Sequence, residues 1–207
     1  MIRRAGDRAV VVDLGSLAEV HALSAALREL RLVGVEDLLG GLVSLTVVFD
    51  PAQVSVGALA AAVRSAPLEH YRAVPSRLIE IPVVYDGADL AEVAERCALS
   101  VAEVTARHAA TEYTVAIVGF SAGFGYLRGL DPQLTVPRRS SPRLSVPAGA
   151  VAIAADMTCV YPRPSPGGWQ LLGHTDRSMW DDSCDPPGLV APGDRVRFVP
   201  ARGVGQT

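Results

Sequence analysis

The chain has 207 residues, of which 49% are hydrophobic and 20% are charged, and its formal net charge is −3 at pH 7. These values are typical of an ordinary globular protein, and a chain of this length can bury a stable core as one domain or as two small ones. The slight excess of negative charge argues against nucleic-acid binding, for which a basic surface would be expected.

Several residue types are absent or sparse, and their absence excludes certain chemistries. The chain contains no lysine, so it offers none for a Schiff base, a P-loop or the attachment of biotin. The cysteines Cys97, Cys159 and Cys184 are far apart, which predicts neither a disulfide framework nor a zinc site, and no metal site is expected. No secretory signal and no apolar run of the ~20 residues that a membrane span needs is visible. We therefore expect a cytoplasmic protein that does not enter a membrane.

The first part of the chain predicts alternating strands and helices. In chain order they are a strand at 8–14, a helix that opens on the capping box Ser16–Glu19, a hairpin at 35–49 that turns at Gly40-Gly41, a helix at 54–65 and a strand at 77–84. The order β-α-β-β-α-β is the ferredoxin-like arrangement. We place this first, α+β domain at residues 1–76.

Residues 88–110 predict two short helices, which open at Asp89 and Ser100. Their spacing imitates a helix-turn-helix, but Ala98 stands where a turn glycine is expected. The second helix also carries only one arginine, Arg107, beside Glu103, whereas reading bases needs arginine, asparagine or glutamine on the exposed face, so DNA binding is not expected.

Short strands separated by proline and glycine follow and predict a closed or nearly closed β-barrel at residues 77–207. They lie at 113–118, 144–146, 150–154, 170–173 and 195–199, and residues 203–207 are expected to form a loose tail.

The stretch 119–169 combines glycines, prolines and aromatic residues without a helical apolar period. Loops stiffened in this way suit the lining of a small-molecule pocket. The predicted lining residues are Phe124, Tyr126, Tyr161, Gly167, Gly168 and Trp169. The alternative is plain β-turn chemistry around a core tryptophan.

Residues 119–150 contain four arginines and a single acidic residue, Asp131, which gives this stretch a net charge of +3. Three of them, Arg138, Arg139 and Arg143, belong to one proline-bounded run. In an extended segment Arg139 and Arg143 project to the same side, which suits an anionic ligand. Pairing of these arginines with carboxylates elsewhere, or with a partner subunit, is the equally open alternative.

His174, together with Asp176, is the best acid–base candidate among the four histidines. A hydrogen-bonded structural histidine is the alternative for His174. Cys159 is predicted to be a buried strand residue rather than a nucleophile, and Asp181-Asp182 to be a solvated turn rather than a metal site.

Several motifs, taken in order, resemble those of a known family. They are G-F-S-A-G-F-G-Y-L-R-G-L-D at 119–131, P-R-R-S-S-P-R at 137–143, V-P-A-G-A-V at 146–151, Y-P-R-P-S-P-G-G-W at 161–169 and G-D-R-V-R-F at 193–198. The family comprises allophanate hydrolase subunit 1, the B-type subunit of 5-oxoprolinase and the Kip-type inhibitor of a sporulation histidine kinase. The opening at 3–9 also resembles it, so the resemblance covers nearly the whole chain.

The resemblance implies an N-terminal α+β domain joined to a cyclophilin-like β-barrel. It implies a subunit of an ATP-dependent 5-oxoprolinase, which converts 5-oxo-L-proline, ATP and water into L-glutamate, ADP and phosphate. The implied partners are a homologous barrel subunit (allophanate hydrolase subunit 2, or the C-type subunit of 5-oxoprolinase) and an A-type subunit of 5-oxoprolinase. ATP would be bound by the assembled complex, with no cofactor attached covalently to this chain. A histidine-kinase inhibitor and a subunit of a urea- or allophanate-processing amidohydrolase are the alternatives.

Four positions depart from the family's usual residues. Ala122 stands in place of proline, 155–157 in place of Gly-Gly-Gln, Cys159 in place of glycine and His174 in place of arginine. These positions lie in or beside the motifs, so we expect them to bear on the substrate.

Overall fold

The structure is a computed structural model that describes residues 1–72 and 77–201. The chain divides into two compact units, Met1–Pro75 and Ser76–Thr207. The expected domain boundary at residue 76 and the expected loose tail at 203–207 lie outside the described residues, and both stay predictions. No helix in the described ranges is long and apolar enough to cross a membrane.

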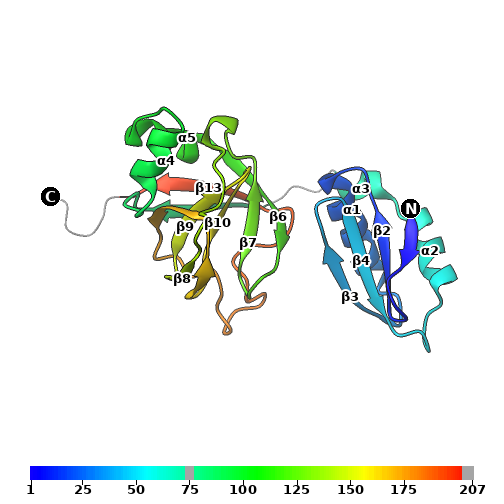
Figure 1. The fold of residues 1–207 in the computed structure, drawn as a ribbon. Helices are drawn as coiled ribbons and strands as arrows, with labels where there is room; N and C mark the ends of the chain where they lie inside the picture. The colour runs from blue at the N-terminus through cyan, green and yellow to red at the C-terminus, as the bar shows by residue number, and fades with distance from the viewer. Residues whose placement is uncertain (73–76, 202–207) are drawn as a thin grey trace. The chain divides into compact units, whose positions relative to one another are not determined.

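The first unit is a four-stranded antiparallel sheet with three helices (Figure 1). Its strands are β1 Ile2–Arg4, β2 Ala9–Asp13, β3 Val35–Gly40 and β4 Ser44–Phe49, in the sheet order β1-β2-β4-β3, and its helices are α1 Leu17–Leu30, α2 Val56–Ser65 and α3 Leu68–Arg72. Helix α1 begins where the Ser16 hydroxyl accepts a hydrogen bond from the Glu19 amide at 3.3 Å. On β4 every second residue is buried, which directs one face of the sheet into the core of this unit.

The strand predicted at 77–84 does not belong to this sheet. It forms β5 (Leu78–Val83), which runs parallel to β13 (Arg195–Pro200) in the second unit. The sheet edge beside β2 is occupied instead by β1. The α+β class is confirmed, but the last element of the βαββαβ assignment was wrong. The physical reason is that an alternation of apolar and polar residues predicts a strand but does not predict which sheet the strand joins.

The second unit is a nearly closed barrel of seven strands, as the spacing of short strands predicted (Figure 1). In sheet order the strands are β12 Gln170–His174, β9 Ala150–Ala154, β10 Met157–Val160, β7 Gly125–Arg128, β6 Glu112–Val118, β13 Arg195–Pro200 and β5 Leu78–Val83. The two ends of the sheet meet at Val84 and His174, whose backbones exchange two hydrogen bonds of 2.9 Å. A separate two-stranded antiparallel sheet pairs β8 (Arg143–Val146) with β11 (Ser165–Gly167), and η1 (Pro132–Leu134) is a single 3₁₀ turn.

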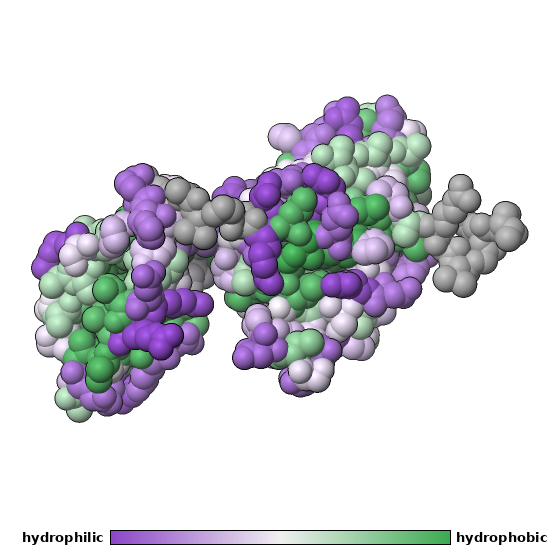
Figure 2. Space-filling view, turned by 180° about the vertical axis from the view of Figure 1, so that it is seen from behind, coloured by the Kyte–Doolittle hydropathy of each residue, from purple (hydrophilic) through white to green (hydrophobic). Residues whose placement is uncertain are grey.

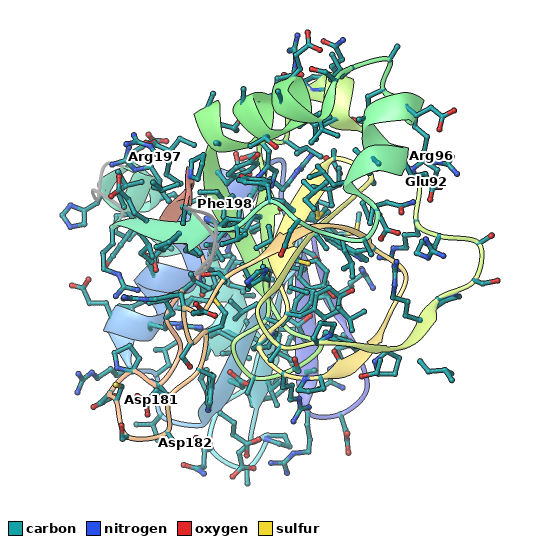
Figure 3. All side chains as sticks on the ribbon, turned by 90° about the vertical axis from the view of Figure 1, so that its left-hand side faces the viewer. Glu92, Arg96, Asp181, Asp182, Arg197 and Phe198 are labelled. Carbon is teal, nitrogen blue, oxygen red and sulfur yellow. The ribbon has the colours of Figure 1, made fainter. Side chains whose placement is uncertain are left out.

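Two helices, α4 (Leu90–Arg96) and α5 (Val101–Ala110), lie together at one end of the barrel (Figure 1). Helix α5 opens on the predicted capping box between Ser100 and Glu103. On α4 the exposed Glu92 and Arg96 form an ion pair of 2.8 Å (Figure 3). Arg107, the arginine that a DNA-reading helix would need, is bonded to Asp131 at 2.8 Å.

His108 on α5 is a structural histidine in the barrel core. Its ring stacks on Phe198 with 4.6 Å between centroids. Nε2 lies 2.9 Å from the Thr158 hydroxyl, which itself donates to the Ala152 carbonyl, and Nδ1 lies 2.8 Å from the Tyr85 hydroxyl. Thr158 therefore accepts from Nε2–H, and Tyr85 donates to Nδ1. Burial lowers the pKa of His108 to about 3, so the ring is neutral.

Candidate functional site

The strands of the barrel separate two apolar clusters. On β9 the side chains alternate: Val151 and Ile153 belong to the barrel core, whereas Ala150, Ala152 and Ala154 belong to a second cluster on the outer face. Because alanine is small, this outer face has room for large rings. The rings that pack over it are those of Phe124, Tyr126, Tyr161 and Trp169, which we call the aromatic cluster.

The rings of the aromatic cluster contact one another edge to face, except that Phe124 and Tyr126 are tilted at 59°. Phe124 is central, with centroids 4.9 Å from Tyr126, 5.3 Å from Tyr161 and 6.3 Å from Trp169. Phe124, Tyr161 and Trp169 are buried, while Tyr126 is half-buried. Phe120 packs against Phe124 at 5.3 Å and is 63% exposed. The cluster is thus mainly a packed core that reaches solvent at Tyr126 and Phe120.

Gly167 has a packing role in this cluster. A Cβ at Gly167 would lie 2.3 Å from the hydroxyl oxygen of Tyr161, so no other residue fits without displacing that ring. Burial raises the pKa of Tyr161 to about 12, and its hydroxyl is therefore neutral. Gly168 is different, because the atoms nearest to its hypothetical Cβ are 3.7 Å away, an ordinary contact.

This difference gives a matched pair of variants. We expect Gly167→Ala to lower the free energy of unfolding of the barrel unit by about 1–3 kcal/mol, as overpacking of a core does. Gly168→Ala should leave it nearly unchanged, because the added methyl group meets only ordinary contacts. Urea unfolding followed by tryptophan fluorescence measures both. Equal stability of the two variants would contradict the packing role of Gly167.

Two of the three arginines in the run 137–143 are bound to one buried carboxylate. Asp89 Oδ1 accepts from Arg139 Nη1 at 2.9 Å and from Arg143 Nη2 at 2.7 Å. Its Oδ2 accepts from the Leu171 amide at 2.7 Å. Of the two interpretations left open for the run, pairing with a carboxylate of the same chain is the one found for Arg139 and Arg143.

Asp89 was expected only to cap α4, but its side chain makes no cap hydrogen bond. Burial is the largest influence on its pKa and raises it. The hydrogen bonds from Arg143 and Leu171 and the charges of both arginines together outweigh that effect, so the pKa of Asp89 lies below its ordinary value of 3.8. The carboxylate stays ionised and anchors the arginine run to the barrel. No sequence signal points to it, because Arg139 is 50 residues away.

Arg138 is placed differently from its two neighbours. It has no carboxylate partner within the part of the chain that the structure describes, and its guanidinium lies 5.9 Å from the centroid of the Trp169 ring. Its positive charge also opposes the rise in the pKa of Tyr126 and Tyr161 that burial causes. Arg138 is therefore the cation of the run that is available to a ligand at the exposed edge of the aromatic cluster.

The predicted acid–base pair is not in contact as a pair. His174 Nδ1 lies 2.8 Å from Oδ1 of Asp86, a residue that the sequence did not single out. Asp176 lines a cavity of 290 Å³ together with Tyr161, Thr175 and Arg177. It also lines a cavity of 540 Å³ that is formed mainly by residues of the loop 176–189 together with Arg77.

Other candidate groups carry no catalytic chemistry. Cys159 is fully buried on β10, and burial raises the pKa of its thiol well above 9, so it is not a nucleophile. Asp181 and Asp182 lie on an outer loop (Figure 3), where Asp181 accepts from Ser183, in keeping with a solvated turn. Among residues 1–72 and 77–201 no three His, Cys, Asp or Glu side chains are grouped to hold a metal ion.

The sequence of the chain is similar to that of a known protein family over most of its length. Residues 1–190 match the family described as the carboxyltransferase domain, subdomain C and D. The chain belongs to this family. The match agrees with the resemblance that the motifs between 119 and 198 indicated.

Two curated relatives are named as the B subunit of 5-oxoprolinase. That of Escherichia coli O157:H7 is 53% identical over 114 residues, which are 55% of this chain and 52% of the relative. That of Bacillus subtilis (strain 168) is 47% identical over 111 residues, which are 54% of this chain and 46% of the relative. The chain thus spans about half the length of the curated relatives it matches.

A solved structure extends the comparison to the whole chain. The crystal structure of TTHA0988 in space group P212121 superposes with a TM-score of 0.86 at 38% identity. The superposition covers 100% of this chain and 41% of that one. The two units therefore recur together as part of a longer polypeptide.

Proposed function

We propose that this chain is a subunit of an ATP-dependent 5-oxoprolinase, which hydrolyses 5-oxo-L-proline to L-glutamate while ATP becomes ADP and phosphate. The observation that carries the proposal is the identity of 53% and 47% to two proteins named as the B subunit of 5-oxoprolinase. The available arginine beside half-buried rings supports it, because 5-oxoproline is a small ring that bears a carboxylate.

Within this proposal, Arg138 binds the substrate carboxylate and the exposed edge of the aromatic cluster contacts the lactam ring. A charge-assisted hydrogen bond of this kind is worth ~1.5–3 kcal/mol. Arg139 and Arg143 hold the run in place through Asp89. Gly167 lets the chain just before Trp169 pack against Tyr161, and the Gly168 carbonyl accepts a hydrogen bond from the Arg139 amide at 2.7 Å.

The reaction needs partners, since the related proteins are named as subunits. A homologous barrel subunit of the C type and a further one of the A type are the proposed partners. Figure 2 shows apolar side chains gathered on one face of the barrel unit with polar ones around them, a pattern found where proteins associate. We assign ATP to the assembled complex, because the glycines at 119–125 match no P-loop and the chain has no P-loop lysine.

Reconstitution tests the proposal. The chain is mixed with its two partner subunits, ATP and 5-oxo-L-proline, and L-glutamate and ADP are measured. We expect equal amounts of both products, and none when this chain is omitted. Parallel mixtures contain urea or allophanate in place of 5-oxoproline, or a sporulation histidine kinase whose autophosphorylation is followed. Turnover of urea or allophanate alone, or kinase inhibition without glutamate, would replace the proposal by the corresponding alternative.

A further inference from the structure

Gln170 on β12 is a buried glutamine whose side chain reaches the arginine run. It is 1% exposed, and its Nε2 donates to the Pro137 carbonyl at 3.1 Å. A carbonyl only accepts hydrogen bonds, so the nitrogen of the side-chain amide faces Pro137. The other end of the amide, Oε1, is buried and has no hydrogen-bond partner within residues 1–72 and 77–201. The amide is therefore oriented by one hydrogen bond, which it makes to the residue before Arg138.

The backbone on both sides of Arg138 is fixed to the segment that carries Trp169. The residue before Arg138 is bonded to Gln170, and the amide of the residue after it, Arg139, donates to the Gly168 carbonyl at 2.7 Å. These two contacts make the segments antiparallel and place Arg138 opposite Trp169. The guanidinium accordingly lies 5.9 Å from the centroid of the Trp169 ring.

The side chain of Arg138 has no fixed anchor of its own. It is exposed, and it forms no ion pair with a carboxylate in the described ranges of the chain. A long side chain without a partner keeps much of its rotamer freedom, so the place of its guanidinium depends on how the backbone presents it. The Gln170 hydrogen bond fixes that presentation, because the Pro137 carbonyl belongs to the peptide that joins Pro137 to Arg138.

Packing alone does not explain a glutamine at position 170. A buried polar atom without a partner destabilises a fold, and leucine fills a similar volume without bringing one. Pro137 lies at the surface, where water can take the place of the lost amide. Gln170→Leu is therefore expected to leave the barrel unit at least as stable as the wild type. What leucine cannot reproduce is the hold on the peptide before Arg138.

We propose that Gln170 is a positioning residue, which holds the peptide before Arg138 so that the guanidinium stays over Trp169 and receives the substrate carboxylate; its effect on turnover rests on the proposed function. Loss of the amide frees the guanidinium to leave the ring without removing its charge. Binding of 5-oxoproline then weakens. The chemical step, in which Gln170 takes no part, keeps its rate.

Trp169 fluorescence tests the positioning without turnover. The chain has two tryptophans, so Trp180→Phe leaves Trp169 as the only indole. In that background we expect Arg138→Ala to change the Trp169 emission, because a charge over the ring is removed. Gln170→Leu should change it in the same direction, and the two changes together should have no more effect than Arg138→Ala alone. Unchanged emission in either single variant would overturn the inference.

Kinetics of the reconstituted complex test the consequence for the substrate. Gln170→Leu should raise KM for 5-oxoproline about 5- to 20-fold while kcat and KM for ATP stay unchanged, since only the carboxylate contact is weakened. In an Arg138→Ala background it should raise KM no further, because no guanidinium remains to be positioned. Effects that multiply would show that Gln170 acts through another group and would overturn the inference.

Two further variants complete the design. Gln133→Leu replaces an exposed glutamine of the same unit and should leave KM and emission unchanged. Gln170→Met, whose flexible side chain fills the site without a donor, should repeat the behaviour of Gln170→Leu if the branched side chain disturbs the fold. If the wild-type mixture makes glutamate and KM stays unchanged in the Gln170 variants, the inference fails while the proposed function stands. If it makes none, the proposed function fails, and the Trp169 emission decides the positioning by itself.

Discussion

Replacement of Asp89 by alanine is expected to lower the free energy of unfolding of the barrel unit by about 3–5 kcal/mol, because it leaves two guanidiniums without their buried anion. The side chain of Asp89 is 3% exposed, and it accepts three hydrogen bonds from segments far apart in the chain. Both tryptophans of the chain, Trp169 and Trp180, lie in the second unit, so their fluorescence during urea unfolding reports on the barrel.

The matched control for Asp89 is Asp156→Ala. Asp156 pairs with Arg128 at 2.7 Å, but its side chain is 48% exposed, so its loss should cost about 0–1 kcal/mol. Because the pKa of Asp89 is lowered in the fold, its contribution is complete above 3.8 and is lost as the pH falls further. A loss of stability no larger than that of the control would show that Asp89 does not anchor the run.

Arg138→Ala is expected to lower kcat/KM of the reconstituted enzyme for 5-oxoproline about 10- to 100-fold, without loss of barrel stability. The reason is that one charge-assisted hydrogen bond of ~1.5–3 kcal/mol is removed, and each 1.4 kcal/mol is about tenfold. Arg138 has no ion pair in the described parts of the chain and its guanidinium lies 5.9 Å from the centroid of the Trp169 ring, so the fold should not depend on it.

Two variants separate this role from others. Arg163→Ala removes an exposed arginine that has no ion pair among the described residues, and it should leave kcat/KM unchanged. Arg139→Ala should destabilise the barrel, because it breaks the contact with Asp89. An Arg138 variant with unchanged kcat/KM would remove this residue from the substrate site.

Much of the fold could be predicted because its signals are local. The capping box at Ser100 and the strand at 150–154 each depend on residues within a few positions of one another. The short strand β7 was not predicted and β10 was anticipated only at Cys159, since their residues lie among glycines or beside polar turns that hide alternation. The buried setting of Cys159 followed from its apolar neighbours.

Local patterns were enough to predict the α+β class, the barrel and the family, because the motifs and turn residues that indicate them lie close together in the chain. That β5 joins the barrel rather than the first sheet is visible only in the folded chain. The structure also shows that Asp89 accepts hydrogen bonds from Arg139 and Arg143, whereas Arg138 has no carboxylate partner among the described residues. The carboxylate that contacts His174 is that of Asp86 rather than that of Asp176. Strand pairing and ion pairs depend on which distant segments come together in the fold. The residues of these pairs lie 50 to 88 positions apart, so no local sequence pattern predicts their contact.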